Sequence, residues 1–122
     1  MMGNISEKIS IGKVLKALGV KQVVTQDPLR LEQAIAAVQE AVDFKGTAAV
    51  IFESPCIAVT KPSPLYSVDL AKCTGCKRCI KELGCPAIVK ENTKVRIDAS
   101  WCSGCSICAQ VCPFEAIGGV QK

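Results

Sequence analysis

The sequence predicts an α+β protein in two parts. Hydrophobic spacing alternates between helical and strand periods over residues 10–53, which indicates an N-terminal α/β segment. Two runs of four cysteines follow in the C-terminal half, and each run closes with a Cys-Pro pair. A chain of 122 residues supports one ordinary domain or two small ones. We therefore expect two domains, residues 1–62 and 63–122.

The cysteine spacing is the most specific feature of the chain. The first run consists of Cys73, Cys76, Cys79 and Cys85, and the second of Cys102, Cys105, Cys108 and Cys112. The second run has the bacterial ferredoxin spacing, in which three thiolates surround one iron–sulfur cluster. The sequence therefore predicts a bacterial-type dicluster ferredoxin fold over 63–122 that carries two [4Fe–4S] clusters.

The ligand sets of the two clusters are predicted to be crossed, because the last cysteine of each run binds the other cluster in two-cluster ferredoxins. Cluster I then takes Cys73, Cys76, Cys79 and Cys112. Cluster II takes Cys102, Cys105, Cys108 and Cys85. Zinc is one weaker alternative, because a tetrahedral ion bound by pairs of cysteines leaves the third close cysteine of each run unused. A disulfide framework is the other weaker alternative. The lack of histidine excludes Rieske centres and Cys/His zinc fingers.

Composition favours a reducing cytoplasm and argues against nucleic-acid or membrane partners. Residues 1–10 lack the apolar region of a signal peptide, and no apolar run approaches the roughly 18–20 residues of a membrane span. The formal net charge is +4, yet each cluster with its four thiolates adds about −2, which leaves the loaded chain close to neutral. The chain also has too few aromatic residues for the aromatic–basic interleaving of a single-strand binder.

The N-terminal segment is predicted to contain one right-handed βαβ unit. We expect a helix, a strand, a second helix and a second strand over 10–19, 20–25, 27–46 and 47–52. Ser10 is the expected N-cap of the first helix, and Asp27-Pro28 the expected start of the second. The apolar run of the last strand suits burial on both faces of a parallel sheet. Two helices hardly cover both faces, so we expect the edge of a larger domain or a partner, with the cluster domain as the alternative cover.

The cluster half is predicted to repeat a unit of strand, cysteine loop, helical turn and strand. The expected strands are 66–69, 87–90, 94–98 and 116–120, and the expected helical turns are 80–83 and 109–111. The first and last strands are expected to pair. Gly75 and Gly104 are expected to adopt positive φ and so bring backbone N–H groups close to the cluster sulfides. The expected apolar coat of the clusters is Ile80, Leu83, Ile88, Ile107, Val111, Phe114 and Ile117.

Further residues outside the ligand sets carry predictions of their own. The ninth cysteine, Cys56, is interpreted as a small buried hydrophobe, with a redox-sensitive thiol or spare ligand as the alternative. Trp101 is expected to pack against cluster II. The prolines within 61–64 are expected to mark the domain boundary. A basic rim around the first cysteine loop either steers an acidic ferredoxin-type acceptor or merely offsets cluster charge; its members are Lys72, Lys77, Arg78 and Lys81.

The cysteine motifs carry a family resemblance. The segment Cys73–Ala87 reads CTGCKRCIKELGCPA, and its five-residue gap and Glu-Leu-Gly-Cys-Pro ending resemble the ferredoxin domain of the alpha subunit of indolepyruvate:ferredoxin oxidoreductases. The segment Cys102–Ile117, CSGCSICAQVCPFEAI, is similar to the second motif of that domain. Upstream, the Asp27-Pro28 pair and the strand before Pro55-Cys56 look like the last βαβ portion of the subunit's thiamine-binding domain.

The resemblance implies a role in electron transfer. That family oxidatively decarboxylates arylpyruvates with thiamine diphosphate and coenzyme A, and passes electrons through its clusters to ferredoxin. This chain has no Gly-Asp dipeptide, which the family's Mg–diphosphate signature requires, so we expect no catalytic site of its own. The resemblance thus implies an iron–sulfur part of a 2-oxoacid oxidoreductase, with ferredoxin and catalytic subunits as partners. The alternative is an autonomous dicluster ferredoxin with an N-terminal docking domain.

Overall fold

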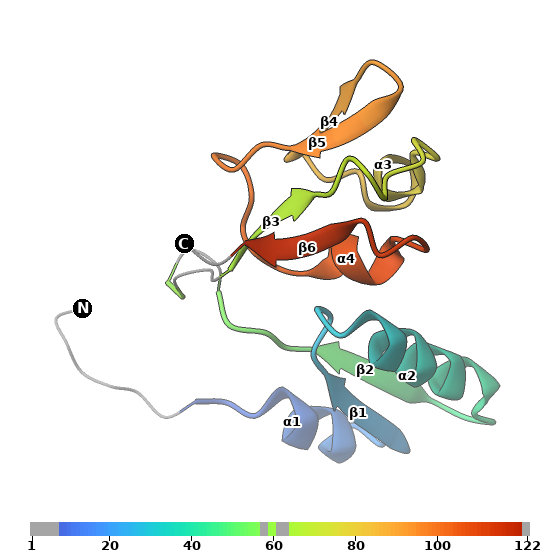
Figure 1. The fold of residues 1–122 in the computed structure, drawn as a ribbon. Coiled ribbons are helices and arrows are strands. Elements are labelled where there is room, and N and C mark those ends of the chain that lie inside the picture. Colours follow the sequence, from blue (N-terminus) through green and yellow to red (C-terminus); the bar gives the residue numbers. More distant parts are fainter. Residues whose placement is uncertain (1–7, 57–58, 61–63, 121–122) are drawn as a thin grey trace, which may run out of the picture. The chain divides into compact units, whose positions relative to one another are not determined.

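The computed structural model describes residues 8–56, 59–60 and 64–120. The chain separates into two compact units, Met1–Ser54 and Pro55–Lys122. Both units contain helices and strands (Figure 1), as expected for an α+β protein. The proline segment that we expected at the boundary falls mostly outside the described residues, since 61–63 are not among them.

The N-terminal unit contains the predicted βαβ arrangement. Its elements in order are α1 (Ile11–Ala17), β1 (Gln22–Gln26), α2 (Leu31–Asp43) and β2 (Ala48–Phe52). The two strands pair in parallel, with Gln22 opposite Ala48 and Gln26 opposite Phe52. The prediction of Ser10 as the first N-cap is confirmed, because its hydroxyl accepts a hydrogen bond from the Lys13 N–H at 3.3 Å.

The predicted start of the second helix is wrong. Asp27 and Pro28 lie in a turn, and the helix begins only at Leu31. The Asp27 carboxylate accepts a hydrogen bond from the Leu29 N–H at 2.9 Å, so it closes a local turn and does not cap the helix. An aspartate can close such a turn because its short side chain reaches a backbone N–H two residues further on.

Much of the apolar surface of the N-terminal unit is not buried. In α2 only Ala34 and Ala37 are buried, whereas Ile35 and Val38 are 48% and 41% exposed. Strand β2 is half-buried along its length, and Phe52 at its end is 50% exposed. The elements of this unit therefore leave the strand only partly covered, as expected for two helices that cannot cover both faces, and its two-sided burial in a larger domain or against a partner stays a prediction.

The C-terminal unit confirms the predicted internal repeat. Its elements in order are β3 (Leu65–Val68), α3 (Arg78–Leu83), β4 (Ile88–Glu91), β5 (Lys94–Ile97), α4 (Ile107–Val111) and β6 (Ile117–Val120). Strands β3 and β6 pair antiparallel, as predicted for the first and last strands, and β4 and β5 form the predicted hairpin. The β3–β6 pair joins the two ends of the cluster half (Figure 1).

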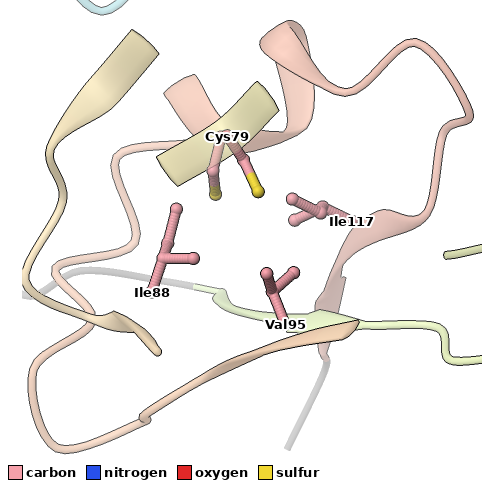
Figure 2. Packing of buried hydrophobic residues seen from close by; sticks show 5 residues of the cluster. Cys79, Ile88, Val95 and Ile117 are labelled. Atoms are coloured by element: carbon pink, nitrogen blue, oxygen red, sulfur yellow. The ribbon is translucent and has the colours of Figure 1, made fainter. Parts of the chain in front are cut away.

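A small core joins the two repeats. Figure 2 shows Cys79, Ile88, Val95 and Ile117 pointing toward one another, and Cys108 belongs to the same buried cluster. Val95, which was not part of the predicted apolar coat, is only 3% exposed. Among the residues that the structure describes, no helix has the length and apolar character needed to cross a membrane.

Candidate functional site

The two cysteine loops have the same unusual backbone. In the first loop Gly75 and Lys77 have positive φ, at 74° and 59°. In the second loop Gly104 and Ser106 take the equivalent positions, with φ of 71° and 66°. Left-handed residues spaced along a loop turn successive backbone N–H groups toward one side and form a concavity that favours anions. Both loops are therefore shaped to surround a negatively charged group, which confirms the expected conformation of the two glycines.

Gly75 is also held by close packing. A Cβ atom built at this position would lie 2.3 Å from the Thr93 carbonyl oxygen, at the tip of the β4–β5 hairpin. The next residue of the hairpin, Lys94, donates a hydrogen bond from Nζ to the Leu70 carbonyl oxygen at 2.5 Å, just before the first loop. The hairpin therefore braces the first cysteine loop, and only glycine fits at its contact point.

The structure groups the eight cysteines of the two runs around two cavities. Cavity I, of about 20 Å³, is lined by the sulfur-bearing residues Cys73, Cys76, Cys79 and Cys112. Cavity II, of about 120 Å³, is lined by Cys85, Cys102, Cys105 and Cys108. Each cavity thus has three cysteines from one run and the last cysteine of the other run. The ninth cysteine, Cys56, lines neither cavity.

The two short helices bring about this exchange of cysteines. Helix α3 starts beside Cys79 at cavity I and ends at Gly84, whose left-handed backbone (φ 55°) directs Cys85 to cavity II. Helix α4 starts beside Cys108 at cavity II and is followed directly by Cys112, which lines cavity I. The two helices contact each other, so the crossing point lies inside one packed unit.

The other walls of the cavities are mostly apolar and come from two strands. On β3, Tyr66 lines cavity II and Val68 lines cavity I. On β5, Ile97 lines cavity II and Val95 lines cavity I. Residues two apart share one face of a strand and lie about 6.6 Å apart along it. The cavities are therefore close neighbours along the same strand faces.

Burial keeps the innermost thiols neutral in the metal-free chain. Loss of solvent contact, together with the nearby Cys105 and Cys102, raises the pKa of Cys108 to about 11. Burial likewise raises the pKa of Cys79, and Cys76 and Cys112 add to this effect. Four thiolates can share such a cavity only if positive charge lies between them, as the core of an iron–sulfur cluster provides.

The donor set of each cavity fits a [4Fe–4S] cluster. Four soft sulfur ligands with no competing carboxylate or imidazole on the cavity wall suit iron–sulfur binding. The Ala116 N–H also donates a hydrogen bond to the Cys112 sulfur at 3.4 Å, the kind of bond that tunes such ligands. Among the described residues, no group of three or more His, Cys, Asp or Glu side chains has the arrangement needed to hold a single metal ion.

Two predictions about residues near the site are wrong. Cys56 is exposed and does not act as a buried hydrophobe. Trp101 is 69% exposed and does not line cavity II, although it directly precedes Cys102. The side chain of Tyr66 takes part in that wall instead. The sequence analysis did not predict Tyr66 as a wall residue. The available signal was that Tyr66 and Val68 are two positions apart on one strand and so share a face.

Residues 95–118 match a protein family described as "4Fe-4S binding domain". This match includes most of β5, the whole second cysteine run and the start of β6. The chain therefore carries the sequence of an iron–sulfur binding domain at the place where the structure forms cavity II.

Most of the chain is similar to curated proteins named indolepyruvate oxidoreductase subunit IorA. It is 37% identical over 119 residues to the protein of Methanothermobacter thermautotrophicus, and 36% identical over 126 residues to that of Pyrococcus abyssi. It is 37% identical over 123 residues to the protein of Thermococcus kodakarensis. These alignments cover 92–95% of this chain but 19% of each relative. The resemblance is thus confirmed, and the chain spans about a fifth of the length of these relatives.

Proposed function

We propose that this chain is an iron–sulfur electron-transfer protein with two [4Fe–4S] clusters. The observation that carries the proposal is the pair of cavities, each lined by four cysteines drawn from both runs. Cluster I is bound by the four cysteines of cavity I, and cluster II by the four cysteines of cavity II. When bound, each cluster accepts or donates one electron.

The residues of the two cavities would hold the clusters close together behind largely apolar walls. The shared faces of β3 and β5 support neighbouring cavities, which keeps the tunnelling gap short. Apolar side chains such as Val68, Val95 and Ile88 line the walls, so little solvent has to reorganise when charge moves. The Ala116 N–H that points at the Cys112 sulfur favours the additional negative charge of a reduced cluster.

The physiological setting that we propose is the oxidation of a 2-oxoacid of the indolepyruvate type. The names of the IorA relatives support this setting. The segment of those relatives that matches this chain would be their electron-transfer part. Catalytic oxidoreductase chains would deliver electrons, and ferredoxin would accept them. We propose a reducing cytoplasm as its location, because eight of its nine cysteines are proposed to bind iron–sulfur clusters as thiolates and not to form disulfides.

The exposed apolar surface of the N-terminal unit favours a role inside a larger assembly over an autonomous ferredoxin. Ile35, Val38 and Phe52 border one shallow hollow on this unit, together with Ala34. Large apolar patches on a soluble protein mark sites of association. We therefore propose that residues 1–62 connect the chain to its partners, and that residues 63–122 form the electron-transfer domain.

Anaerobic reconstitution tests the proposal directly. We expect about eight irons and eight acid-labile sulfides per chain, and an EPR spectrum of two interacting spins after reduction with dithionite. A Cys56→Ser variant serves as the control and should retain the full iron content, because Cys56 lies outside both cavities. Stoichiometric zinc without sulfide would contradict the proposal.

A further inference from the structure

The two cavities differ sharply in the charge around them. Between Ala99 and Phe114, a stretch that includes the whole second cysteine run, the sequence contains no Asp, Glu, Lys or Arg. The first loop and the helix after it instead carry four basic residues, which are Lys72, Lys77, Arg78 and Lys81. Lys77 and Arg78 line cavity I itself, whereas no charged residue lines cavity II.

The charge at cavity I is only partly neutralised. Arg78 forms an ion pair with Glu82 at 2.7 Å, one helical turn further on. Within the described part of the chain, Lys72, Lys77 and Lys81 have no ion-pair partner. A net positive charge therefore remains at this end of the unit. Cys76, a residue of the same loop, is exposed, so the cationic surface includes a predicted cluster ligand.

We propose that cluster I is the exit point of the chain, and that electrons pass from cluster II to cluster I and from there to an acidic one-electron iron–sulfur carrier. This inference rests on the two-cluster function proposed above. In the first step reduced cluster II is oxidised by one electron and cluster I is reduced by it. In the second step cluster I is reoxidised and the carrier is reduced by one electron. No proton is transferred and no bond is formed or broken.

Two independent features make cluster I the better electron acceptor of the pair. The unpaired lysines favour the reduced cluster, which carries one more negative charge than the oxidised one. The hydrogen bond from the Ala116 N–H to the Cys112 sulfur acts in the same direction, because it stabilises charge on a ligand of cluster I. Cluster I therefore has the higher reduction potential, and an electron on cluster II moves toward it.

The same charges select the partner. A protein with an acidic surface is attracted to the lysines around Cys76, which speeds encounter at low ionic strength and places its cluster close to cluster I. The uncharged surroundings of the second loop offer no such attraction to an acidic carrier. The interaction surface is therefore the first cysteine loop with α3.

A reciprocal exchange of residues tests the order of the potentials. Lys77 and Ser106 occupy equivalent left-handed positions in the two loops, so Lys77→Ser and Ser106→Lys each place a residue where its counterpart is tolerated. In EPR-monitored redox titrations of the reconstituted protein, we expect Lys77→Ser to lower the higher of the two potentials and Ser106→Lys to raise the lower one. A shift of the lower potential by Lys77→Ser would overturn the proposed order.

Association with a purified acidic ferredoxin, followed by stopped-flow at several ionic strengths, tests the exit surface. We expect Lys77→Ser combined with Lys81→Gln to slow association severalfold at low salt and to flatten its salt dependence. Lys90→Gln combined with Lys13→Gln is the matched control, because it removes the same charge from residues that line neither cavity. Equal slowing by both pairs would contradict the proposed surface. A protein that binds fewer than two clusters would instead contradict the function on which this inference rests.

Discussion

Cys79 and Cys108 hold equivalent positions in the two cysteine loops, and both are buried in the core that joins the repeats. These two cysteines therefore have a structural role in addition to their predicted role as ligands. Their side chains fill space in the same core as isoleucine and valine side chains. Cys76, by contrast, is exposed. This difference among the proposed ligands can be measured before any metal is bound.

Thiol alkylation of the cluster-free protein should distinguish these residues. With iodoacetamide we expect Cys76 to react well before Cys108, because the thiolate is the reactive form and burial raises the pKa of Cys108 to about 11. A raised pKa keeps this thiol neutral, so its rate should climb about tenfold per pH unit and level off only near pH 11.

Peptide mass spectrometry at a series of pH values supplies the measurement. The same protein in urea is the control, where the rate at Cys108 should level off near the ordinary thiol value of 9.0. Loading with clusters should protect the eight cavity cysteines and leave Cys56 reactive. A plateau for Cys108 near pH 9 in the folded protein would contradict the burial of this thiol.

Replacing Gly75 by alanine should damage the first loop beyond the ordinary cost of a left-handed alanine. That ordinary cost is about 1–2 kcal/mol. Gly84→Ala carries it alone, because φ is 55° and nothing lies within 4 Å of the added Cβ. At Gly75 the Cβ also collides with the Thr93 carbonyl oxygen, so the hairpin must move away from the loop.

Iron content and the free energy of unfolding, measured on both glycine variants, check this prediction. We expect Gly75→Ala to be the less stable of the two and to lose iron from cluster I. Equal stability and full iron content in both variants would show that the hairpin does not brace the loop.

At the scale of elements, the cluster half could be predicted well from sequence because its signals are local. Alternating apolar residues gave β3 through β6, and the polar Asn92 between two strands gave the hairpin turn, where its φ is 53°. The N-terminal unit was predicted less accurately. The Asp27 carboxylate can accept a backbone hydrogen bond either as a helix cap or in a turn, and the local sequence does not distinguish these two roles.

The predicted site shows the same division between local and distant information. The two ligand sets expected from the spacing of the cysteines are the groups that line the two cavities, and their binding of clusters stays a prediction. The wall residues Tyr66 and Val95 were missed, because strand alternation shows which residues share a face but does not show that this face lines a cavity. Trp101 was misjudged for a related reason, since adjacency to Cys102 does not fix the direction of a side chain.

At the scale of the whole molecule, the N-terminal unit has too few helices and strands to cover its own apolar surface. Its sheet contains two strands, and the hollow bordered by Ile35, Val38 and Phe52 lies open. The relatives are about five times as long as the segment that matches this chain. A partner surface, from the same protein or another, would account for the exposed side chains.

Purified alone, the chain should therefore self-associate in a concentration-dependent way through this hollow. We expect Val38→Glu to reduce the association severalfold, because a carboxylate in the hollow must be desolvated when the surface is covered. Gln33→Glu, on the same helix but outside the hollow, adds the same charge and is the control. Sedimentation velocity at several concentrations makes the comparison, and a monomeric wild-type chain would contradict this account.

The crossed ligand sets are the central claim, and paired substitutions test them most directly. If Cys85 and Cys105 bind the same cluster, the double variant Cys85→Ala/Cys105→Ala loses that cluster and keeps the other intact. If Cys85 and Cys76 bind different clusters, Cys85→Ala/Cys76→Ala damages both. We would measure iron, sulfide and the EPR spectrum of these two reconstituted proteins. The account predicts about four irons and one intact [4Fe–4S] signal for the first and no intact signal for the second. The reverse result would contradict it.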